Sequence, residues 1–451
     1  MEVTLMEMLE AREKRALRQR QLLDDYGQTL VCFTMNIAGP VKSSPLIRRG
    51  FDLGRRALTE QLAVAGFPVV HSESVEENTG CELLLVVSAE ALAVKALTAS
   101  LEEDSPLGRL FDMDVLGPDG QKVERAALGL PGRRCLLCGG PATVCARSRA
   151  HTVAQLQEKT GAILEEALAQ ADGDTAARLA CQALLYEVAV TPKPGLVDRA
   201  NSGSHRDMDF FSFQASAAAL WPYFRRCVQV GADTRSLPPE ATFRQLRFPG
   251  KLAEADMLRA TGGVNTHKGV IFSMGVLCGA LGRLDRQLWA SPEAVAAECA
   301  AMTKGLVAGD YAGLTPETAK TAGQKLYLQY GVTGVRGQAE AGFPAVVQTG
   351  LPTLEAALAA GKTLDQAGCA ALLAMLAQTA DTNLIHRGGY DLQQKTAGEL
   401  KALLERDPFP DAQTLEALDR AFIQKNLSPG GTADLLALTF LLYFLKEEPY
   451  E

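Results

Sequence analysis

This sequence has few cysteines, no excess of basic residues and no N-terminal apolar run long enough to cross a membrane. Residues 1–20 are amphipathic and charged and contain neither a secretory signal nor a membrane span, so we expect a cytoplasmic protein with no membrane partner. Ten cysteines among 451 residues are too dilute for a disulfide scaffold. The formal net charge of −8 argues against nonspecific binding of nucleic acid. Small anionic molecules are therefore the expected ligands.

The remaining composition is that of a globular protein with a large core. Hydrophobic residues make up 47% of the chain and charged residues 22%. At about 100 to 200 residues per domain, this length predicts two or three domains. Short apolar runs alternate with helical stretches between residues 29 and 120, which is typical of a mixed α/β domain.

The second half of the chain has a different pattern. After Asp172 the segments are long, rich in alanine and leucine, and apolar at helical spacing, which predicts an all-α domain. The small, polar residues 169–175 mark the boundary, so we predict a multidomain protein with domains at residues 1–170 and 176–451. Glycine-rich polar connectors separate the helices and are expected to carry the functional residues. Helices are expected at residues 176–190, 210–230, 268–284, 292–307, 316–330, 354–360, 364–380, 391–405, 412–425 and 433–446.

An aspartate pair is the first candidate site. Asp112 and Asp114 lie in a strand-like segment, and because side chains alternate along a strand, the two carboxylates share one face. Such a pair can hold Mg²⁺ for nucleotidyl transfer, since Mg²⁺ binds carboxylate and triphosphate oxygens. A solvent-facing strand edge is the alternative for a bare pair. The loop with Asn36 and Lys42 follows a predicted strand and favours phosphate contacts, and Glu82 offers a third carboxylate.

A basic segment that contains cysteines follows the aspartate pair. Four arginines between residues 133 and 149 have the fork geometry that matches phosphate oxygens, and a solvated basic face is the alternative. Cys135, Cys138, Cys145 and His151 have the spacing C-x2-C-x6-C-x5-H and offer four tetrahedral ligands to Zn²⁺. Close packing of small buried cysteines explains the same spacing without a metal.

Residues 36–42, 108–115 and 133–151 together resemble the apo-citrate lyase phosphoribosyl-dephospho-CoA transferase family. The resemblance implies a nucleotidyltransferase-like domain that attaches a phosphoribosyl-dephospho-CoA group to a serine of the citrate lyase acyl carrier subunit and releases pyrophosphate. It also implies that Asp112 and Asp114 act in catalysis and hold Mg²⁺. Phosphate contacts are expected from Asn36, Lys42, Arg109, Arg147 and Arg149. The malonate decarboxylase carrier is the alternative protein partner.

The connectors of the helical half contain a second set of candidate residues. Pro192 and Pro194 end a helix and preset the loop that follows. That loop leads to His205, Asp207 and Asp209, and such a cluster is costly to bury without a cation. A solvated polar loop is the alternative for this cluster by itself.

A glycine-rich connector precedes a long apolar helix. It contains Gly262, Gly263, Asn265, His267 and Lys268, and its backbone N–H groups can face an anion at the helix N-terminus. A helix cap explains Asn265 but not the whole set. Later connectors also combine carboxylates with glycines at helix junctions, which suggests loops that converge on a polyphosphate with bound Mg²⁺. These connectors contain Arg336, Glu340, Arg387, Gly430, Gly431 and Asp434.

Residues 191–198, 205–209, 262–269, 334–340 and 428–434 resemble, in this order, the triphosphoribosyl-dephospho-CoA synthase family. The resemblance implies that the helical half joins C1 of the ATP ribose to the 2′-hydroxyl of dephospho-CoA and expels adenine. Glu187, Asp207 or Asp209 is expected to accept the hydroxyl proton. The expected Mg²⁺ ligands are Asp207, Asp209 and Asp434. Substrate contacts are expected from Lys193, His205, Gly262, Gly263, Asn265, His267, Lys268, Arg336, Glu340, Arg387, Gly430 and Gly431.

Other functions fit parts of the pattern. A helical scaffold with Asp-rich loops and Mg²⁺ also suits hydrolysis of ADP-ribose or another N-glycoside, and the N-terminal half would then dock a carrier protein without chemistry. Dependence of adenine release on dephospho-CoA separates synthesis from hydrolysis. In the main interpretation the C-terminal half acts first, because the N-terminal half consumes its product.

Overall fold

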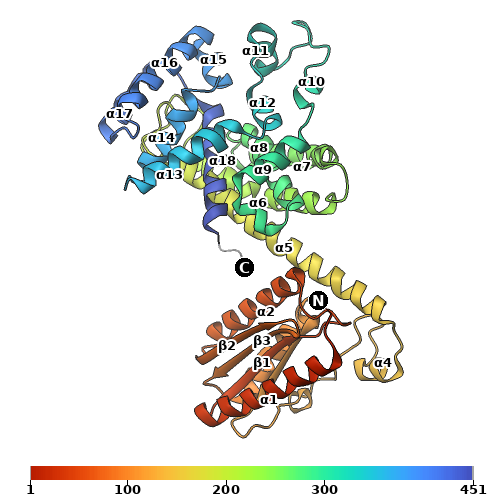
Figure 1. Cartoon of the computed structure of the whole chain (residues 1–451). Coiled ribbons are helices and arrows are strands. Elements are labelled where there is room, and N and C mark those ends of the chain that lie inside the picture. The colour runs from red at the N-terminus through yellow and green to blue at the C-terminus, as the bar shows by residue number, and fades with distance from the viewer. Residues whose placement is uncertain (1, 449–451) are drawn as a thin grey trace. The chain divides into compact units, whose positions relative to one another are not determined.

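The computed structural model describes residues 2–448, which form two compact units (Figure 1). The first unit ends at Leu168 and the second begins at Ala169, inside the continuous helix α5 (Val153–Ala189). Residues 169–175, where the domain boundary was expected, are helical. Asp174 pairs with Arg225 of the next helix at 2.6 Å. Leu168, Ala176 and Ala177 on either side of this segment are buried, and such packing overrides the weak helix propensity of small polar residues.

The first unit is built on a four-stranded sheet with the strand order β2-β3-β1-β4. All three strand pairings are antiparallel. This arrangement confirms the prediction of a sheet with helices in the N-terminal half. In chain order the unit contains α1 (Leu5–Tyr26), β1 (Thr29–Met35), α2 (Pro45–Val64), β2 (Val69–Glu77), β3 (Gly80–Val87), α3 (Ala91–Glu103), β4 (Phe111–Leu116) and α4 (Ala142–Ser148).

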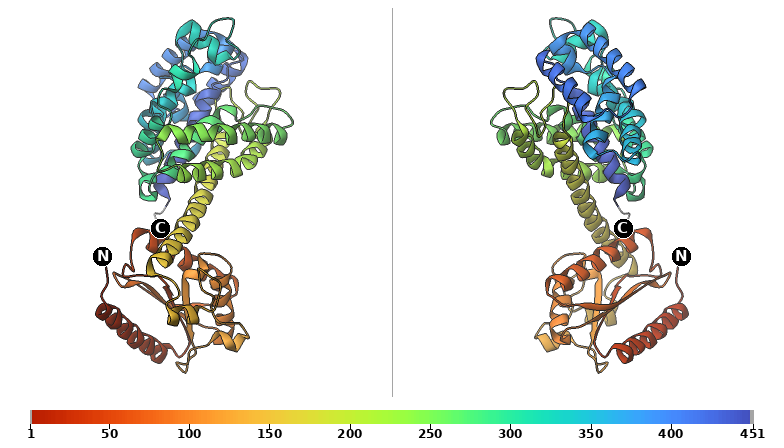
Figure 2. Two further views of the ribbon diagram at one scale, coloured as in Figure 1. Left: turned by 90° about the vertical axis from the view of Figure 1, so that its right-hand side faces the viewer. Right: turned by 90° about the vertical axis from the view of Figure 1, so that its left-hand side faces the viewer.

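The two faces of this sheet pack against different helices. In β1, Val31 and Phe33 point into a core that also contains Phe51 of α2. The alternate residues Leu30 and Cys32 lie in a smaller cluster that includes residues of α1. Figure 2 shows α1 and α3 on opposite sides of the sheet. Because side chains alternate along β1, every second residue of this strand faces α1.

The second unit consists of helices and connectors, and its described residues 169–448 contain no strand. This confirms that the C-terminal half is helix-rich. Among residues 2–448, no helix has both the length and the hydropathy needed to cross a membrane. After α5 the helices are α6 (Phe210–Asp233), α7 (Pro239–Ala260), α8 (Lys268–Arg283), α9 (Pro292–Met302), α10 (Leu306–Asp310), α11 (Ala322–Tyr330), α12 (Gly334–Glu340), α13 (Leu351–Ala359), α14 (Leu364–Leu376), α15 (Thr382–Gly388), α16 (Tyr390–Arg406), α17 (Ala412–Gln424) and α18 (Gly430–Glu447).

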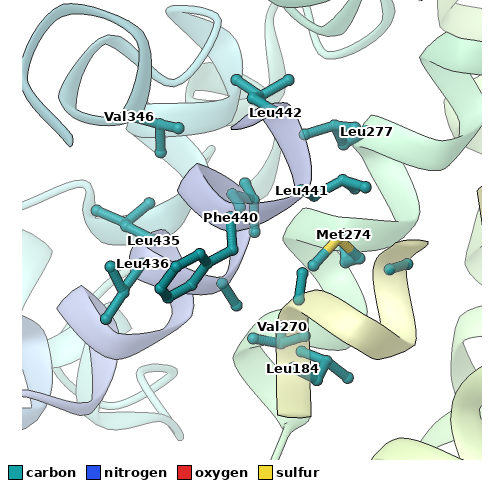
Figure 3. Close-up of a cluster of buried hydrophobic side chains, with 14 of the residues drawn as sticks. Leu184, Val270, Met274, Leu277, Val346, Leu435, Leu436, Phe440, Leu441 and Leu442 are labelled. Carbon is teal, nitrogen blue, oxygen red and sulfur yellow. The ribbon is translucent and has the colours of Figure 1, made fainter. Parts of the chain in front are cut away.

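Helix α18 lies in the core of this unit. Its residues Leu436, Phe440 and Leu441 belong to a buried cluster with Met274 of α8 and Leu184 of α5 (Figure 3). Because α18 is apolar over most of its surface, it is buried on several sides. Burial of this helix fixes its N-terminal end, which carries the predicted glycine pair.

Several helix predictions need correction. Helix α7 was not expected, yet it runs through Pro249, because Leu246, Ala253 and Met257 are buried at helical spacing and hold it against its neighbours. The helix expected from residue 316 begins only at Ala322, where Thr321 provides a capping box. Residues 334–340 and 382–388 were expected as connectors and form the short helices α12 and α15.

Candidate functional site

The second unit contains a cavity of about 730 Å³, a volume suited to a nucleotide-sized ligand. The first turns of α8 and α18 line it, together with the connectors around residues 193–208, 331–335 and 379–387. Helix N-termini carry unpaired backbone N–H groups and a partial positive charge. These two helix ends therefore offer the cavity backbone donors of the kind that bind phosphate groups.

A buried ion pair forms one wall of this cavity. Lys193 is 1% exposed, and its amino group donates a hydrogen bond to the carbonyl oxygen of Glu187 at 2.6 Å and also pairs with the Glu187 carboxylate. Burial raises the pKa of Glu187, and the charge of Lys193 opposes that rise. Lys193 is thus engaged by Glu187 rather than free to bind phosphate.

Two buried aspartates hold the loop that carries Lys193. Asp198 accepts hydrogen bonds from the backbone N–H groups of Lys193 at 2.9 Å and Ala200 at 2.7 Å. Asp419 accepts one from Gly195 at 2.9 Å. Gly195 has φ +72°, and a Cβ there would lie 2.2 Å from a backbone oxygen, so only glycine fits. The loop is rigid because its backbone donors are satisfied by fixed carboxylates.

Asp434 is the carboxylate of the cavity that has no protein partner. No donor among residues 2–448 forms a hydrogen bond with it, although it is partly buried. Its pKa is raised by burial and then by the negative charges of Glu187 and Asp381. A Cβ at Gly269 would lie 2.0 Å from its carboxylate, so the first turn of α8 approaches Asp434 closely. A cation bound in the cavity would compensate this charge.

Asp381 also lines the cavity, but hydrogen bonds within the protein occupy its carboxylate. Its carboxylate accepts hydrogen bonds from the backbone N–H groups of Asn383, Leu384 and Thr432, and from the Thr432 hydroxyl, at 2.7 to 3.0 Å. These contacts cap α15 and join it to the start of α18. Asp381 is therefore a structural residue, whereas Asp434 is available to a ligand.

Two histidines of the cavity are held in place by hydroxyl groups. His267 Nδ1 lies 2.6 Å from Ser216 Oγ, and its Nε2 is buried without a partner among the described residues. Burial and the charge of Lys193 lower the pKa of His267 to about 3, so this imidazole is neutral. His205 Nε2 lies 2.9 Å from Ser428 Oγ.

The cavity collects most of the residues predicted for the helical half. Lys268 reaches it although its amino group also pairs with Glu254 at 3.0 Å. Arg387 reaches it and donates a hydrogen bond to the carbonyl oxygen of Ser204 at 2.9 Å. The predicted residues that line the cavity are Glu187, Lys193, His205, Asn265, His267, Lys268, Arg387, Gly430, Gly431 and Asp434.

The other predicted residues of this half do not line the cavity. Asp209 caps α6 by accepting a hydrogen bond from the Ser212 N–H at 2.8 Å, and Asp207 is exposed. Arg336 donates to Asp310 at 2.8 Å. Glu340 accepts hydrogen bonds from two backbone N–H groups at the start of α10. Gly262 and Gly263 form a turn with positive φ after α7.

Sequence reasoning overlooked several polar residues that line the cavity. They all lie in segments that were expected to be polar connectors, so membership of such a segment was the available signal. The overlooked residues are Thr333, Asp381, Asn383, His386, Ser428 and Thr432.

The sheet unit brings three acidic residues to one face. Thr34 of β1 is opposite Glu82 of β3 on one side and Asp112 of β4 on the other, and Asp114 is opposite Cys32. These positions lie on the face against which α1 packs, but the Asp112 and Asp114 side chains remain 51% and 36% exposed. The observed register thus has Asp112 and Asp114 on one face of the sheet, as predicted, and Glu82 lies on the same face.

Basic side chains surround this acidic face. Lys122 pairs with Asp114 at 2.6 Å, and Arg133 lies 3.9 Å from Asp112. Arg15 of α1 pairs with Glu82 at 2.6 Å. Partial burial, followed by the charge of Asp114, raises the pKa of Asp112. The face therefore has charged groups of both signs next to solvent.

The predicted phosphate-binding residues of this unit differ in their surroundings. Asn36 is exposed at the end of β1, and Lys42 donates to the carbonyl oxygen of Ile37. Arg109 donates to the carbonyl oxygen of Arg134. Arg147 and Arg149 are exposed, and no residue between 2 and 448 forms a hydrogen bond or ion pair with either side chain.

The four predicted metal ligands of this unit lie together. One ligand atom from each of Cys135, Cys138, Cys145 and His151 can be chosen so that all four lie within 4.8 Å of one another. Two of the sulfur atoms, from Cys138 and Cys145, are 3.4 Å apart. Nε2 of His151 is buried and has no partner among the described residues. The four potential ligand atoms are thus close enough together to hold one metal ion.

An anion-accepting cavity in one unit and a face with three carboxylates in the other define a two-part transferase. The family model for ATP:dephospho-CoA triphosphoribosyl transferase matches residues 173–450, and the model for apo-citrate lyase phosphoribosyl-dephospho-CoA transferase matches residues 3–167. The chain belongs to the family of fused CitXG proteins, which combines these two transferases.

Individual relatives agree with this membership. Protein CitXG of Haemophilus influenzae is 39% identical over 98% of this chain and 96% of its own length. Protein CitXG of Leuconostoc mesenteroides subsp. cremoris is 32% identical over 98% of this chain and 97% of its own length. The 2-(5''-triphosphoribosyl)-3'-dephosphocoenzyme-A synthase of Pectobacterium atrosepticum is 46% identical over 59% of this chain and 87% of its own length.

Proposed function

We propose that the helix-rich unit forms triphosphoribosyl-dephospho-CoA from ATP and dephospho-CoA and releases adenine. The observation that carries this proposal is the cavity in which the N-terminal ends of α8 and α18 meet the unpartnered carboxylate of Asp434. Backbone N–H groups at Gly430 and Gly431, with the amino group of Lys268, line this cavity and would receive the triphosphate.

In the proposed reaction the 2′-hydroxyl of dephospho-CoA attacks C1 of the ATP ribose while the bond to adenine breaks. A carboxylate must take the hydroxyl proton. Among the three acids expected as this base, only Glu187 lines the cavity, so we assign the role to Glu187. Its raised pKa suits proton transfer near neutral pH, and Lys193 favours its ionised form.

Mg²⁺ fits both proposed sites. In the cavity Asp434 offers carboxylate oxygens that no described residue uses, and Asp112 and Asp114 offer a pair on one strand face. Bound Mg²⁺ would supply positive charge that neutralises phosphate oxygens. The exposed position of Asp207 and the capping contacts of Asp209 make Asp434 the preferred ligand of the three acids first considered.

For the sheet unit we propose a nucleotidyltransferase-like reaction. A serine of the citrate lyase acyl carrier subunit would attack the phosphorus nearest the ribose, and pyrophosphate would leave. Asp112 and Asp114 would act with Mg²⁺, and the unpartnered side chains of Arg147 and Arg149 would neutralise the departing pyrophosphate. Lys42 and Arg109 lie in the same unit but make backbone contacts that would have to yield.

Zn²⁺ is the proposed metal at the cysteine cluster. Three thiolates and one imidazole match the ligands of a structural zinc site. Around tetrahedral Zn²⁺, sulfur ligands at about 2.3 Å from the metal are roughly 3.7 Å apart, which is close to the 3.4 Å between the Cys138 and Cys145 sulfurs.

Incubation of the protein with ATP and dephospho-CoA tests the first reaction. We expect adenine release that requires dephospho-CoA, because the 2′-hydroxyl is the attacking group. Adenine release from ATP alone would instead support N-glycoside hydrolysis. Adding purified citrate lyase carrier and malonate decarboxylase carrier to separate reactions tests the second step, and we expect mass addition to the citrate lyase carrier.

A further inference from the structure

Residues 133–151 of the sheet unit, here called the arginine segment, interleave arginines with the proposed metal ligands. Arg133 and Arg134 directly precede Cys135, and Arg147 and Arg149 lie between Cys145 and His151. Every arginine of the segment is therefore within four residues of a metal ligand in the sequence.

One end of the arginine segment is attached to the aspartate strand β4. Arg133 donates a hydrogen bond to the carbonyl oxygen of Phe111 and lies 2.7 Å from the Glu102 carboxylate. Arg109 donates to the carbonyl oxygen of Arg134. These contacts join the residues just before Cys135 to the start of the strand that carries Asp112 and Asp114.

The remainder of the segment has little apolar packing to hold it. Helix α4 has seven residues and none of them is buried, and so short a helix is marginal without other contacts. Leu136 packs against the core of the unit. The turn after it is closed by a hydrogen bond from the Gly139 N–H to the carbonyl oxygen of Cys135 at 3.1 Å. Without a metal, α4 and the arginines near it have few tertiary contacts.

We infer that Zn²⁺ bound by Cys135, Cys138, Cys145 and His151 positions Arg147 and Arg149 beside the aspartate pair for the triphosphate of the transferase substrate. Four protein ligands close the coordination shell, so the metal acts on structure and not on the substrate. Metal binding and local folding are coupled in such small sites. The inference rests on the proposed transfer reaction of the sheet unit.

The test compares zinc content, order and activity in the full-length protein. We expect about one Zn²⁺ per chain by mass spectrometry after purification with a thiol reductant and no chelator. Cys138→Ser and Cys145→Ser should lose it. Cys181→Ser is the matched control, since Cys181 lies in the helix-rich unit and its thiol donates to a carbonyl oxygen that serine can also reach.

Stripping Zn²⁺ with a chelator, which is then removed before Mg²⁺ is restored, provides a second comparison that needs no substitution. Trypsin should then cleave within residues 133–151 faster, and added Zn²⁺ should restore protection. The KM for triphosphoribosyl-dephospho-CoA in carrier modification should rise about tenfold or more, because charged phosphate contacts are lost. Adenine release should not change, because that reaction belongs to the other unit.

Three results would overturn parts of the account separately. Wild-type protein that neither contains nor takes up Zn²⁺, or that has a Cys138–Cys145 disulfide by thiol counting, would remove the metal site. Zinc-free protein with an unchanged KM for transfer would remove the positioning role. Zinc-loaded protein with a protected arginine segment that never modifies a carrier would instead contradict the proposed transfer reaction.

Discussion

The two units handle charge in opposite ways. The helix-rich unit buries the pair of Lys193 and Glu187, at 1% and 4% exposure, in the wall of its cavity. The sheet unit leaves half of the Asp112 side chain exposed, and Arg147 and Arg149 have no partner among residues 2–448. A cavity with buried charges suits small substrates, because burial limits the access of water to a reactive sugar intermediate. An open face suits a reaction in which the attacking serine belongs to a folded carrier protein.

The largest expected effect is on the rate of adenine release and comes from substitution of Asp434 in the cavity. Asp434→Asn should slow adenine release by about 10²- to 10⁴-fold, because it removes the unpartnered charge proposed to hold Mg²⁺. Carrier modification from supplied triphosphoribosyl-dephospho-CoA should be unchanged. Chromatography of adenine and mass spectrometry of the carrier measure the two steps.

Asp207→Asn is the matched control for this substitution, because Asp207 is exposed and does not line the cavity. It should retain near-normal adenine release. A slow Asp207→Asn protein beside an active Asp434→Asn protein would contradict the assignment of the metal ligand.

The next largest effect is on stability of the helix-rich unit. Lys193→Met should lower its free energy of unfolding by about 3 to 5 kcal/mol, since the variant leaves Glu187 buried without a counter-charge. Both tryptophans, Trp221 and Trp289, belong to this unit, so tryptophan fluorescence during urea unfolding reports on it alone.

An exposed ion pair of the same unit serves as the comparison. Arg199 pairs with Asp365 at 2.5 Å, and the two side chains are 50% and 38% exposed. Arg199→Met should cost about 0 to 1 kcal/mol. The double variant Lys193→Met/Glu187→Met should recover most of the loss. Equal losses for the two single variants would contradict the role of burial.

A smaller effect is expected from pH. The pKa of His267 is lowered to about 3 in the folded protein, whereas an unfolded histidine titrates near 6.5. Between these values the unfolded chain binds the extra proton, so the free energy of unfolding falls as pH decreases below about 6.5. The contribution of His267 at pH 5 is about 2 kcal/mol.

His267→Gln isolates this contribution, because the raised pKa values of Glu187 and Asp434 act in the opposite direction in both proteins. Tryptophan-monitored unfolding at pH 7 and pH 5 should show a smaller loss in the variant. Identical pH dependence in the two proteins would mean that His267 is not held neutral by the fold.

The sequence predicted those features that depend on local periodicity. Alternation along one strand was enough to place Asp112 and Asp114 on one face, and apolar spacing located α8 and α18. It did not predict α7, which contains Pro249 and is held by burial of Leu246 and Met257. Local pattern and tertiary packing disagree at that helix.

Local sequence pattern could not predict the role of an individual carboxylate. Asp209, Asp381 and Asp434 all lie near helix N-termini, where an acid can cap the helix or bind a ligand. Only the contacts made in the folded unit show that Asp209 and Asp381 are occupied by backbone and hydroxyl donors. Convergence of the connectors on one cavity likewise depends on helix packing over long sequence distances.

The central claim is that two separate sites in one chain carry out consecutive reactions. Asp112→Asn tests it most directly when adenine and modified carrier are measured in one reaction with ATP, dephospho-CoA and citrate lyase carrier. The account predicts normal adenine release, accumulation of triphosphoribosyl-dephospho-CoA and no modified carrier. Loss of adenine release together with carrier modification would contradict it.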